Sequence, residues 1–288
     1  RREFLRTASL LGLSAGAAAA MAGVPPLARQ ALAQTAAPKR GGNIRVSMNV
    51  KAVNDPATFD WGQMGNTARH VIEPLVRIDS ANRARPHLAE SWQASPDLKT
   101  WNFKLRQGVK WSNGDNFGAD DVIFNINRWL DPKTGSSNMG RFSSMVTATD
   151  TGKKDDKGKP IISRSMTPGA VEKIDDRTVR LHLNRAEIAL PESFGDYPAL
   201  IAHRRFAESG GNFAKDPVGT GPFALKEFKV GDKAVLTRRP APYWGGDVHL
   251  DQITYIDHGD DPAAMVAASA SDQIDTCHQA SIEQIDAL

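Results

Sequence analysis

The sequence predicts an α/β fold in which short strands and helices are interleaved along the chain rather than segregated. Segments with strict alternation of apolar and polar residues predict strands, and a segment with apolar residues at helical spacing predicts a helix between them. With 40% hydrophobic and 24% charged residues, the composition is that of a globular protein. The glycines and prolines are spread without a period, which indicates many turns and argues against a helical bundle or a repeat array.

The first predicted strand is residues 43–49, in which three apolar residues alternate with polar ones. Residues 50–65 have no clear period and are expected to be irregular. Residues 69–78 carry apolar residues at helical spacing, so we expect a helix there. Pro74 interrupts the pattern and should keep this helix short or bent.

Residues 98–105 alternate again and predict a second strand. Residues 109–111 predict a further short strand that enters a tight turn. The turn is expected because Asn113-Gly114 supplies the positive φ values that a two-residue hairpin connection needs.

A helix is expected next, with apolar residues at helical spacing over 122–130. Either Asp120 or Asp121 should cap its start, and Pro132 should end it. Residues 150–160 are charged and contain glycine, so they are expected to form a surface loop.

The remainder of the chain predicts mainly strands. Two alternating stretches around a central Asp-Asp predict a β-hairpin over residues 171–184. Residues 219–222, Gly-Thr-Gly-Pro, have the composition of a turn. Residues 234–237 and 253–256 predict two further short strands.

The first 33 residues, 1–33, predict a signal peptide. The apolar run 10–22 follows a basic opening and is too short to span a bilayer at 1.5 Å rise per residue. Ala31 and Ala33 give the small-residue pattern that predicts cleavage before Gln34. Paired arginines precede Phe-Leu and resemble the twin-arginine motif, and a general secretory signal is the alternative. Since no later stretch is apolar enough to anchor the chain, we expect a soluble, periplasmic mature protein.

Charge and cysteine content exclude several classes of function. The net charge is +3, and residues 1–33 account for all of it, so the mature chain has no excess of basic residues to neutralise phosphates. No nucleic-acid partner is expected. Cys277 is the only cysteine, which excludes an intramolecular disulfide and a multi-thiolate zinc site.

The sequence also lacks the patterns of common catalytic sites. It contains no G-x-S-x-G, no H-E-x-x-H and no G-x-x-x-x-G-K-[ST], and its seven histidines are scattered. We therefore predict that the protein is not an enzyme, and we assign it no catalytic residue, cofactor or metal ligand.

Several sequence blocks occur in a fixed order along the mature chain. They are EPLV at 73–76, LAESW at 88–92, WNFKLRQGVKW at 101–111, NGD at 113–115, ADDV at 119–122, the hairpin at 171–183, PVGTGPF at 217–223 and PYWGG at 242–246. Together these blocks resemble the family 5 extracytoplasmic solute-binding proteins, which bind peptides, nickel chelates or sugars for ABC importers. The resemblance extends from residue 41 to about residue 280.

The resemblance implies a two-lobe fold of the periplasmic-binding-protein type II class, joined by a hinge. Residues 34–69 and 170–270 would form a sheet-based subdomain of the first lobe, with residues 70–169 inserted as a second subdomain. Residues 271–288 would begin the second lobe. Because family members are longer, we expect this reading frame to be incomplete, with the second lobe missing.

The function implied by the resemblance is solute capture for an ABC importer. A di- or oligopeptide would stabilise a closed form of a monomeric protein, which delivers it to a membrane permease and its ATPase. Two alternatives remain. The solute could be nickel or another metal chelate, or the occupied protein could present its ligand to a chemoreceptor.

Two segments are candidates for the solute site. Open α/β sheets bind ligands beyond the carboxyl ends of their strands, which points to the loop after the first strand. The resemblance suggests the stretch 138–145 as the second segment. Both could instead be ordinary surface loops. Trp61 is the one tryptophan not expected to anchor the core. The candidate ligand-binding residues are Asn49, Asn54, Phe59, Asp60, Trp61, Asn138, Met139 and Arg141.

Overall fold

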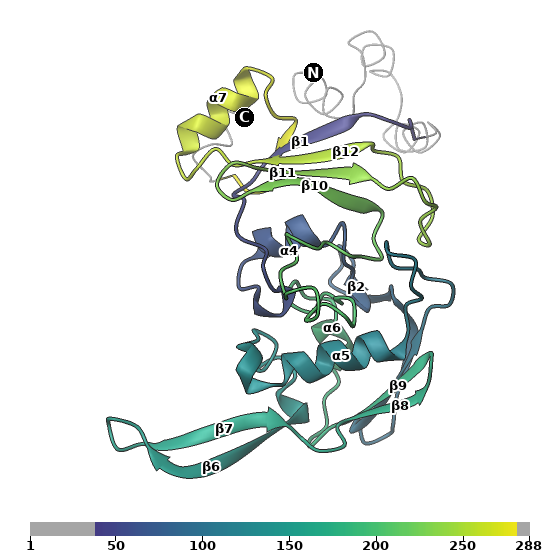
Figure 1. The fold of residues 1–288 in the computed structure, drawn as a ribbon, viewed down its shortest axis with the longest axis vertical. Helices are drawn as coiled ribbons and strands as arrows, with labels where there is room; N and C mark the ends of the chain where they lie inside the picture. Colours follow the sequence, from purple (N-terminus) through teal and green to yellow (C-terminus); the bar gives the residue numbers. More distant parts are fainter. Residues whose placement is uncertain (1–37, 281–288) are drawn as a thin grey trace, which may run out of the picture. The chain divides into compact units, whose positions relative to one another are not determined.

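The computed structural model describes residues 38–280 (Figure 1). The predicted signal peptide, 1–33, and the last eight residues lie outside this range. Within it, no helix is both long enough and apolar enough to cross a bilayer.

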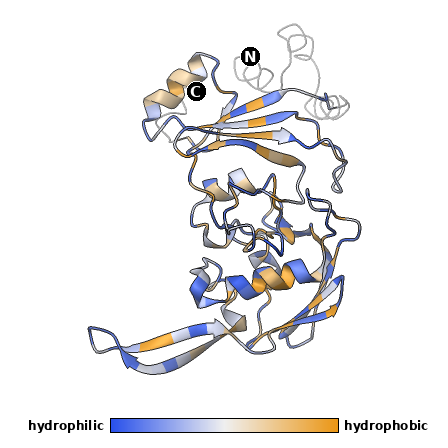
Figure 2. Cartoon of the chain, in the orientation of Figure 1, coloured by the Kyte–Doolittle hydropathy of each residue, from blue (hydrophilic) through white to orange (hydrophobic). Residues whose placement is uncertain are grey.

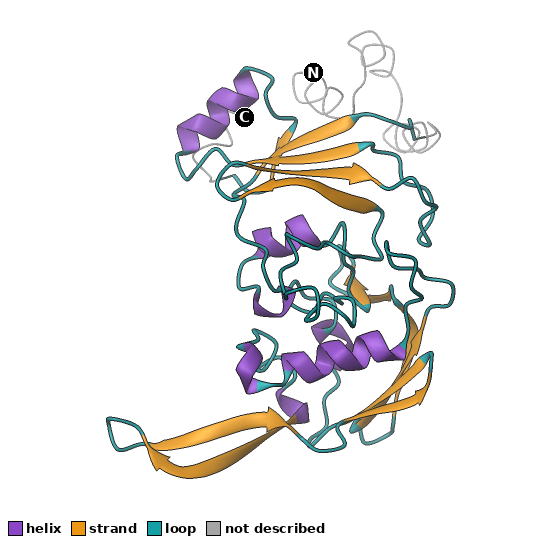
Figure 3. Cartoon of the chain, in the orientation of Figure 1, coloured by secondary structure: helices purple, strands orange, loops and turns teal. Residues whose placement is uncertain are grey.

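Five strands form the first sheet in the order β10 (Phe223–Lys229), β11 (Lys233–Arg238), β12 (Gln252–Ile256), β1 (Asn43–Ser47) and β13 (Thr276–Cys277). β1 pairs in parallel with β12 on one side and with β13 on the other, whereas β10, β11 and β12 pair antiparallel. The carboxyl ends of β12, β1 and β13 therefore meet at one end of the sheet (Figure 3). The strands predicted from residues 43–49, 234–237 and 253–256 are confirmed.

Four antiparallel strands form the second sheet in the order β4 (Ala89–Ala94), β5 (Thr100–Leu105), β9 (Thr178–His182) and β8 (Val171–Asp175). β5 buries Trp101, Phe103 and Leu105, because alternate side chains of a strand point to one face. The helix α5 (Ala119–Trp129) packs on β8 and β9 and ends with the fully buried Trp129. The predicted strand, helix and hairpin in this region are confirmed.

Shorter elements connect the two sheets. Buried residues of both sheets belong to one continuous apolar core, whereas α7 joins a small separate cluster. The apolar stripes of the strands and of α5 are visible in Figure 2. These shorter elements are η2 (Pro56–Thr58), α4 (Gly62–Ala68), β2 (Val76–Ile78), β3 (Ala84–Pro86), η3 (Pro132–Thr134), η4 (Ser143–Met145) and α6 (Leu190–Ser193), whereas α7 (Pro262–Ala270) lies between β12 and β13 of the first sheet.

The helix predicted over residues 69–78 is wrong. The helix in this region, α4, ends at Ala68, and residues 76–78 form β2. The apolar residues that suggested a helix, among them Val71 and Leu75, are buried because residues 71–76 pass through the core. A segment buried on all sides has no polar face, so its spacing does not identify a helix.

The surface loop predicted over residues 150–160 is exposed as expected, but only residues 155–159 of it are a loop. Two antiparallel strands, β6 (Val146–Lys154) and β7 (Pro160–Met166), form a hairpin here. Nearly all of their side chains are exposed. Because neither face of the hairpin is buried, the sequence lacks the apolar alternation by which other strands were found.

The start of α5 differs from the prediction by a few residues. Its N-cap is Gly118 rather than Asp120 or Asp121. Asp121 is fully buried, and its Oδ2 accepts hydrogen bonds from the Gly118 backbone N–H at 3.0 Å and from Trp111 Nε1 at 3.1 Å. The Asp121 carboxylate, in the first turn of α5, therefore provides a hydrogen-bond acceptor for the backbone N–H of the N-cap residue.

The strand predicted at residues 109–111 is reduced to a single bridge between Lys110 and Asn116. The tight turn between them is present, and Gly114 adopts a φ of 92°. The predicted turn is thus present, but only Gly114 and not Asn113 adopts a positive φ, and the strand is too short to form a ladder.

Strand pairing differs from the expected domain division in two places. β8 and β9 fall in the range 170–270 but pair with β5 in the second sheet. β13 falls in the range 271–288 but pairs with β1 in the first sheet. Both differences arise from pairings between distant segments, which the local sequence pattern does not specify.

The carboxylate of Glu73 lies inside the structure and collects four hydrogen bonds. Its Oε1 accepts from Tyr243 Oη and is 2.9 Å from His87 Nε2, and its Oε2 accepts from Thr220 Oγ1 at 2.8 Å and Trp244 Nε1 at 2.9 Å. Burial raises the pKa of Glu73, but hydrogen bonds from His87, Tyr243 and Thr220 lower it further than burial raises it. The carboxylate therefore stays charged and ties three distant segments together.

Position 219 has no room for a side chain, because the Gly-Thr-Gly-Pro turn lies directly against the backbone of Val71. A Cβ at Gly219 would lie only 1.8 Å from the Val71 carbonyl oxygen. The same oxygen accepts a hydrogen bond from the Gly221 N–H at 2.8 Å. This close approach is what brings Thr220 within reach of Glu73.

Gly219→Ala should lower the free energy of unfolding by at least about 2 kcal/mol, because backbone must move to admit the methyl group. Urea denaturation would measure the loss. Gly140→Ala is the matched control, since its Cβ would meet no atom within 4 Å, and it should change stability by less than about 0.5 kcal/mol. Equal stability of the two variants would contradict the close packing described here.

Glu73→Gln should lower the free energy of unfolding at pH 7 by about 2–3 kcal/mol, because buried donors lose their charged acceptor. Since the folded pKa lies below the ordinary value of 4.5, the contribution of Glu73 is present above that value and lost as the pH falls through the folded pKa. Denaturation at pH 7 and pH 3 would show a smaller acid-induced loss in the variant.

Glu90→Gln serves as the control for this measurement. Glu90 is partly exposed and pairs with Lys104 and Arg177, so its loss should cost less than about 1 kcal/mol. A Glu73→Gln protein as stable as the Glu90→Gln protein at pH 7 would show that the carboxylate does not hold the segments together.

Candidate functional site

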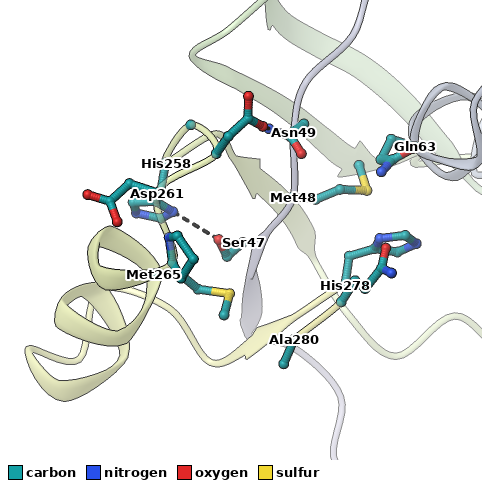
Figure 4. Close-up of a pocket in the computed structure, with 13 residues that line it drawn as sticks. Ser47, Met48, Asn49, Gln63, His258, Asp261, Met265, His278 and Ala280 are labelled. Carbon is teal, nitrogen blue, oxygen red and sulfur yellow. Dashed lines mark hydrogen bonds between the residues drawn. The ribbon is translucent and has the colours of Figure 1, made fainter. Parts of the chain in front are cut away.

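A pocket of about 270 Å³ lies where β1, β12 and β13 end (Figure 4). Residues 47–49 line it from β1, residues 258–262 follow β12, and residues 278–280 follow β13. Gln63 from α4 and Met265 from α7 complete the lining. Because the three strands are parallel, their carboxyl ends place these loops together, which is where open α/β sheets bind ligands.

Hydrogen bonds between the strand ends hold the walls of the pocket. Ser47 Oγ lies 3.0 Å from His258 Nδ1, shown as a dashed line in Figure 4, and the Ser47 carbonyl accepts from the His278 N–H at 2.9 Å. Asn49 Nδ2 donates to Asp260 Oδ1 at 3.2 Å. The Asp257 carboxylate accepts from the backbone N–H of Val50 at 2.7 Å. The exits of β1 and β12 are therefore fixed relative to each other.

The charged lining of this pocket is acidic. Asp260 and Asp261 belong to the lining, as do two imidazoles, while no Lys or Arg is among these lining residues. Asp261 also caps α7 by accepting from the Ala263 N–H at 2.9 Å. Within residues 38–280, no group of three or more His, Cys, Asp or Glu side chains is arranged to hold a metal ion.

A hydrogen bond made by a residue just after the carboxyl end of α4, the helix that carries Gln63, links this helix to β12. His70 Nε2 and Tyr255 Oη form a hydrogen bond of 2.8 Å. Burial, assisted by the neighbouring charge of Arg69, lowers the pKa of His70 to about 4, so the imidazole is neutral at pH 7. Burial raises the pKa of Tyr255 to about 12. The link between α4 and the sheet is therefore an uncharged pair.

The five candidate residues after β1 are spread over different surroundings. Asn49 lines the pocket. Asn54 accepts from Asn212 Nδ2 at 3.1 Å, and Phe59 is fully buried. The Asp60 carbonyl accepts a hydrogen bond from the Tyr197 hydroxyl. Trp61 leaves 57% of its surface exposed, with the Lys51 ammonium 5.7 Å from its ring.

Two of the three candidates of the second segment, Asn138 and Arg141, contact residues 196–198. Asn138 is fully buried and donates from Nδ2 to the Pro198 carbonyl at 2.7 Å. Arg141 pairs with Asp196 and lies 5.8 Å from the centre of the Tyr197 ring. Met139 packs partly buried against the core.

The two candidate segments meet through Tyr197. Its hydroxyl donates to the Asp60 carbonyl at 3.0 Å, while its ring lies beneath Arg141. The structure thus brings Asp60, Trp61 and Arg141 into one neighbourhood, separate from the pocket lining that contains Asn49.

Sequence reasoning did not identify most of the pocket lining. His258, Asp260 and His278 are more than 200 residues away from Ser47, and only the parallel pairing of β1 brings them together. A usable signal was present, because the polar run after β12 stands at a strand end just as Asn49 does. The missing information was that these strands are parallel neighbours.

A larger cavity of about 540 Å³ lies near the start of α5. Three arginines line it, but their guanidinium groups already have partners within the structure. Arg177 pairs with Glu90, Arg204 pairs with Asp121, and Arg106 donates to the His87 carbonyl. We therefore regard the pocket at the strand ends as the candidate solute site.

Comparison with known proteins shows the family to which the chain belongs. The family model for bacterial extracellular solute-binding proteins, family 5, matches residues 83–288. The periplasmic oligopeptide-binding protein OppA of Haemophilus influenzae is 30% identical over 66% of this chain and 34% of its own length. The heme-binding protein A of the same organism is 31% identical over 78% of this chain and 42% of its own length.

Solved structures share the fold. H. influenzae OppA in complex with RPPGFSPFR aligns with a TM-score of 0.70 and 25% identity over 87% of this chain and 48% of that one. NikA of Brucella suis in complex with Fe(III)-EDTA aligns with a TM-score of 0.63 and 28% identity over 81% and 43%. The chain spans less than half the length of these relatives. It belongs to the bacterial extracellular solute-binding proteins of family 5.

Proposed function

We propose that the protein is the solute-binding component of an ABC importer and captures a di- or oligopeptide without changing it chemically. The observation that carries the proposal is the pocket at the carboxyl ends of β1, β12 and β13, in a chain that belongs to a solute-binding family. OppA of H. influenzae is named for oligopeptide binding, and its structure holds a peptide.

The chemistry of the pocket suits a peptide. The side-chain amides of Gln63 and Gln279 can donate to peptide carbonyls and accept from peptide N–H groups, and the amide oxygen of Asn49 can accept from a peptide N–H. The carboxylates of Asp260 and Asp261 favour a ligand group with positive charge, such as a peptide ammonium.

The remaining parts of the proposal concern export and partners. Residues 1–33 would direct export by the twin-arginine route, and the mature, monomeric protein would work in the periplasm. It would deliver its solute to a membrane permease and the associated ATPase. We also propose one subdomain around the five-stranded sheet and an inserted subdomain around the four-stranded sheet, with β8 and β9 in the latter.

A metal chelate is the second candidate solute. It is favoured by the imidazoles of His258 and His278, which both line the pocket, and imidazole is a common metal ligand. A chelated ion brings most of its own ligands, so the protein would need to supply only one or two. NikA of B. suis, solved with Fe(III)-EDTA, shares the fold.

Calorimetric titration of the full-length protein with Ala-Ala-Ala and, separately, with Fe(III)-EDTA should distinguish the two solutes. We expect 1:1 binding of the peptide. Gln63→Ala and Asn49→Ala should each weaken it by about tenfold, because each removes a hydrogen-bonding amide from the pocket, worth about 1.4 kcal/mol.

Gln107→Ala is the control, because this amide lies outside the pocket and contacts Arg177. It should leave peptide affinity unchanged. Saturable binding of Fe(III)-EDTA with none of Ala-Ala-Ala would replace the peptide by a chelate. Peptide binding that is insensitive to both pocket variants would place the site elsewhere.

A further inference from the structure

We infer that Tyr197 is a positioning residue for the solute site. Through one hydrogen bond and one close packing contact, it sets the amino-terminal end of α4, and with it Trp61 and Gln63. The inference rests on the proposed function in that α4 supplies Gln63 to the solute pocket. It gives Tyr197, Arg141 and Asn138 a role that acts through α4 rather than through contact with the solute.

The first turn of α4 depends on a contact from outside the helix. Its N-cap, Trp61, makes no side-chain capping hydrogen bond. Tyr197 Oη instead donates to the carbonyl of Asp60, the residue immediately before that cap, at 3.0 Å. The hydroxyl therefore fixes the path by which the chain enters the helix.

Packing holds the same helix one turn later. A Cβ on Gly65 would lie 2.4 Å from Tyr197 Cβ, so the tyrosine side chain rests directly on the helix backbone. α4 has only seven residues, and a helix this short has little stability of its own in water. Tertiary contacts such as this one therefore decide where α4 lies.

Tyr197 is itself held from the opposite side by the second candidate segment. Asp196 pairs with Arg141 and also accepts from the Tyr197 N–H at 2.7 Å. Arg141 lies over the tyrosine ring, and the buried Asn138 donates to the Pro198 carbonyl at 2.7 Å. Residues 138–141 thus hold residues 196–198 in place through these contacts, and Tyr197 in turn contacts α4.

Tyr197→Phe tests the inference because it removes the hydroxyl and keeps the ring against Gly65. Hydrogen exchange of the full-length protein, followed by mass spectrometry, should become about fivefold faster over residues 60–68, which corresponds to one lost hydrogen bond. Exchange over β5 should not change. Affinity for Ala-Ala-Ala should fall about three- to tenfold with little change in melting temperature.

Two further variants separate positioning from general stability. Tyr243→Phe removes a tyrosine hydroxyl that bonds Glu73 and no residue of α4; it should lower the melting temperature without selective exchange at 60–68. Arg141→Ala should reproduce the exchange effect of Tyr197→Phe in part, and Arg141→Lys, which keeps the ion pair with Asp196, should restore most of the loss.

Unchanged exchange at residues 60–68 in Tyr197→Phe would overturn the inference, as would faster exchange spread evenly over the protein. The exchange measurement needs no ligand. If the wild-type protein does not bind Ala-Ala-Ala, the proposed peptide function fails, while the exchange result still decides whether Tyr197 positions α4.

Discussion

The arrangement of the molecule depends on one buried carboxylate. Glu73 accepts hydrogen bonds from the segments that contain His87, Thr220 and the Tyr243-Trp244 pair. A buried charge is costly unless its hydrogen-bonding capacity is satisfied, so the loss of the contact with any one of these segments would destabilise the buried carboxylate. The sequence blocks EPLV, GTGP and PYW meet at this carboxylate. EPLV supplies Glu73 itself, and the other two blocks supply hydrogen-bond donors to it.

The pocket at the strand ends depends on the segments that Glu73 holds together. The strand that follows the Gly-Thr-Gly-Pro turn, β10, leads into the sheet whose parallel strands end at the pocket. The helix α4 completes the pocket and is held at both ends, by Tyr197 before its start and by the His70–Tyr255 pair after its end. The position of Gln63 is therefore determined by residues that do not line the pocket.

Sequence patterns identified elements with one buried face and one exposed face. β5 and α5 were predicted because their apolar residues recur with the period of the element. The patterns failed where a segment is buried on every side, as around Val71, or exposed on both faces, as in β6 and β7. For the site, Asn49 could be proposed from its place after β1, but His258 and His278 depend on strand order. The role of Arg141 depends on contacts with Tyr197, which no spacing in the sequence indicates.

The parallel pairing of β1 with β12 and β13 has a consequence for the order of folding. β1 is made first, yet both of its partners lie about 200 residues later in the chain. Antiparallel neighbours such as β10, β11 and β12 are close in sequence and can form early, whereas contacts of large sequence separation form slowly. The edges and apolar face of β1 therefore remain open until the rest of this sheet has been synthesised. During synthesis, β1 therefore waits longer for its pairing partners than β10, β11 and β12 do, and an unpaired strand edge favours pairing with other chains.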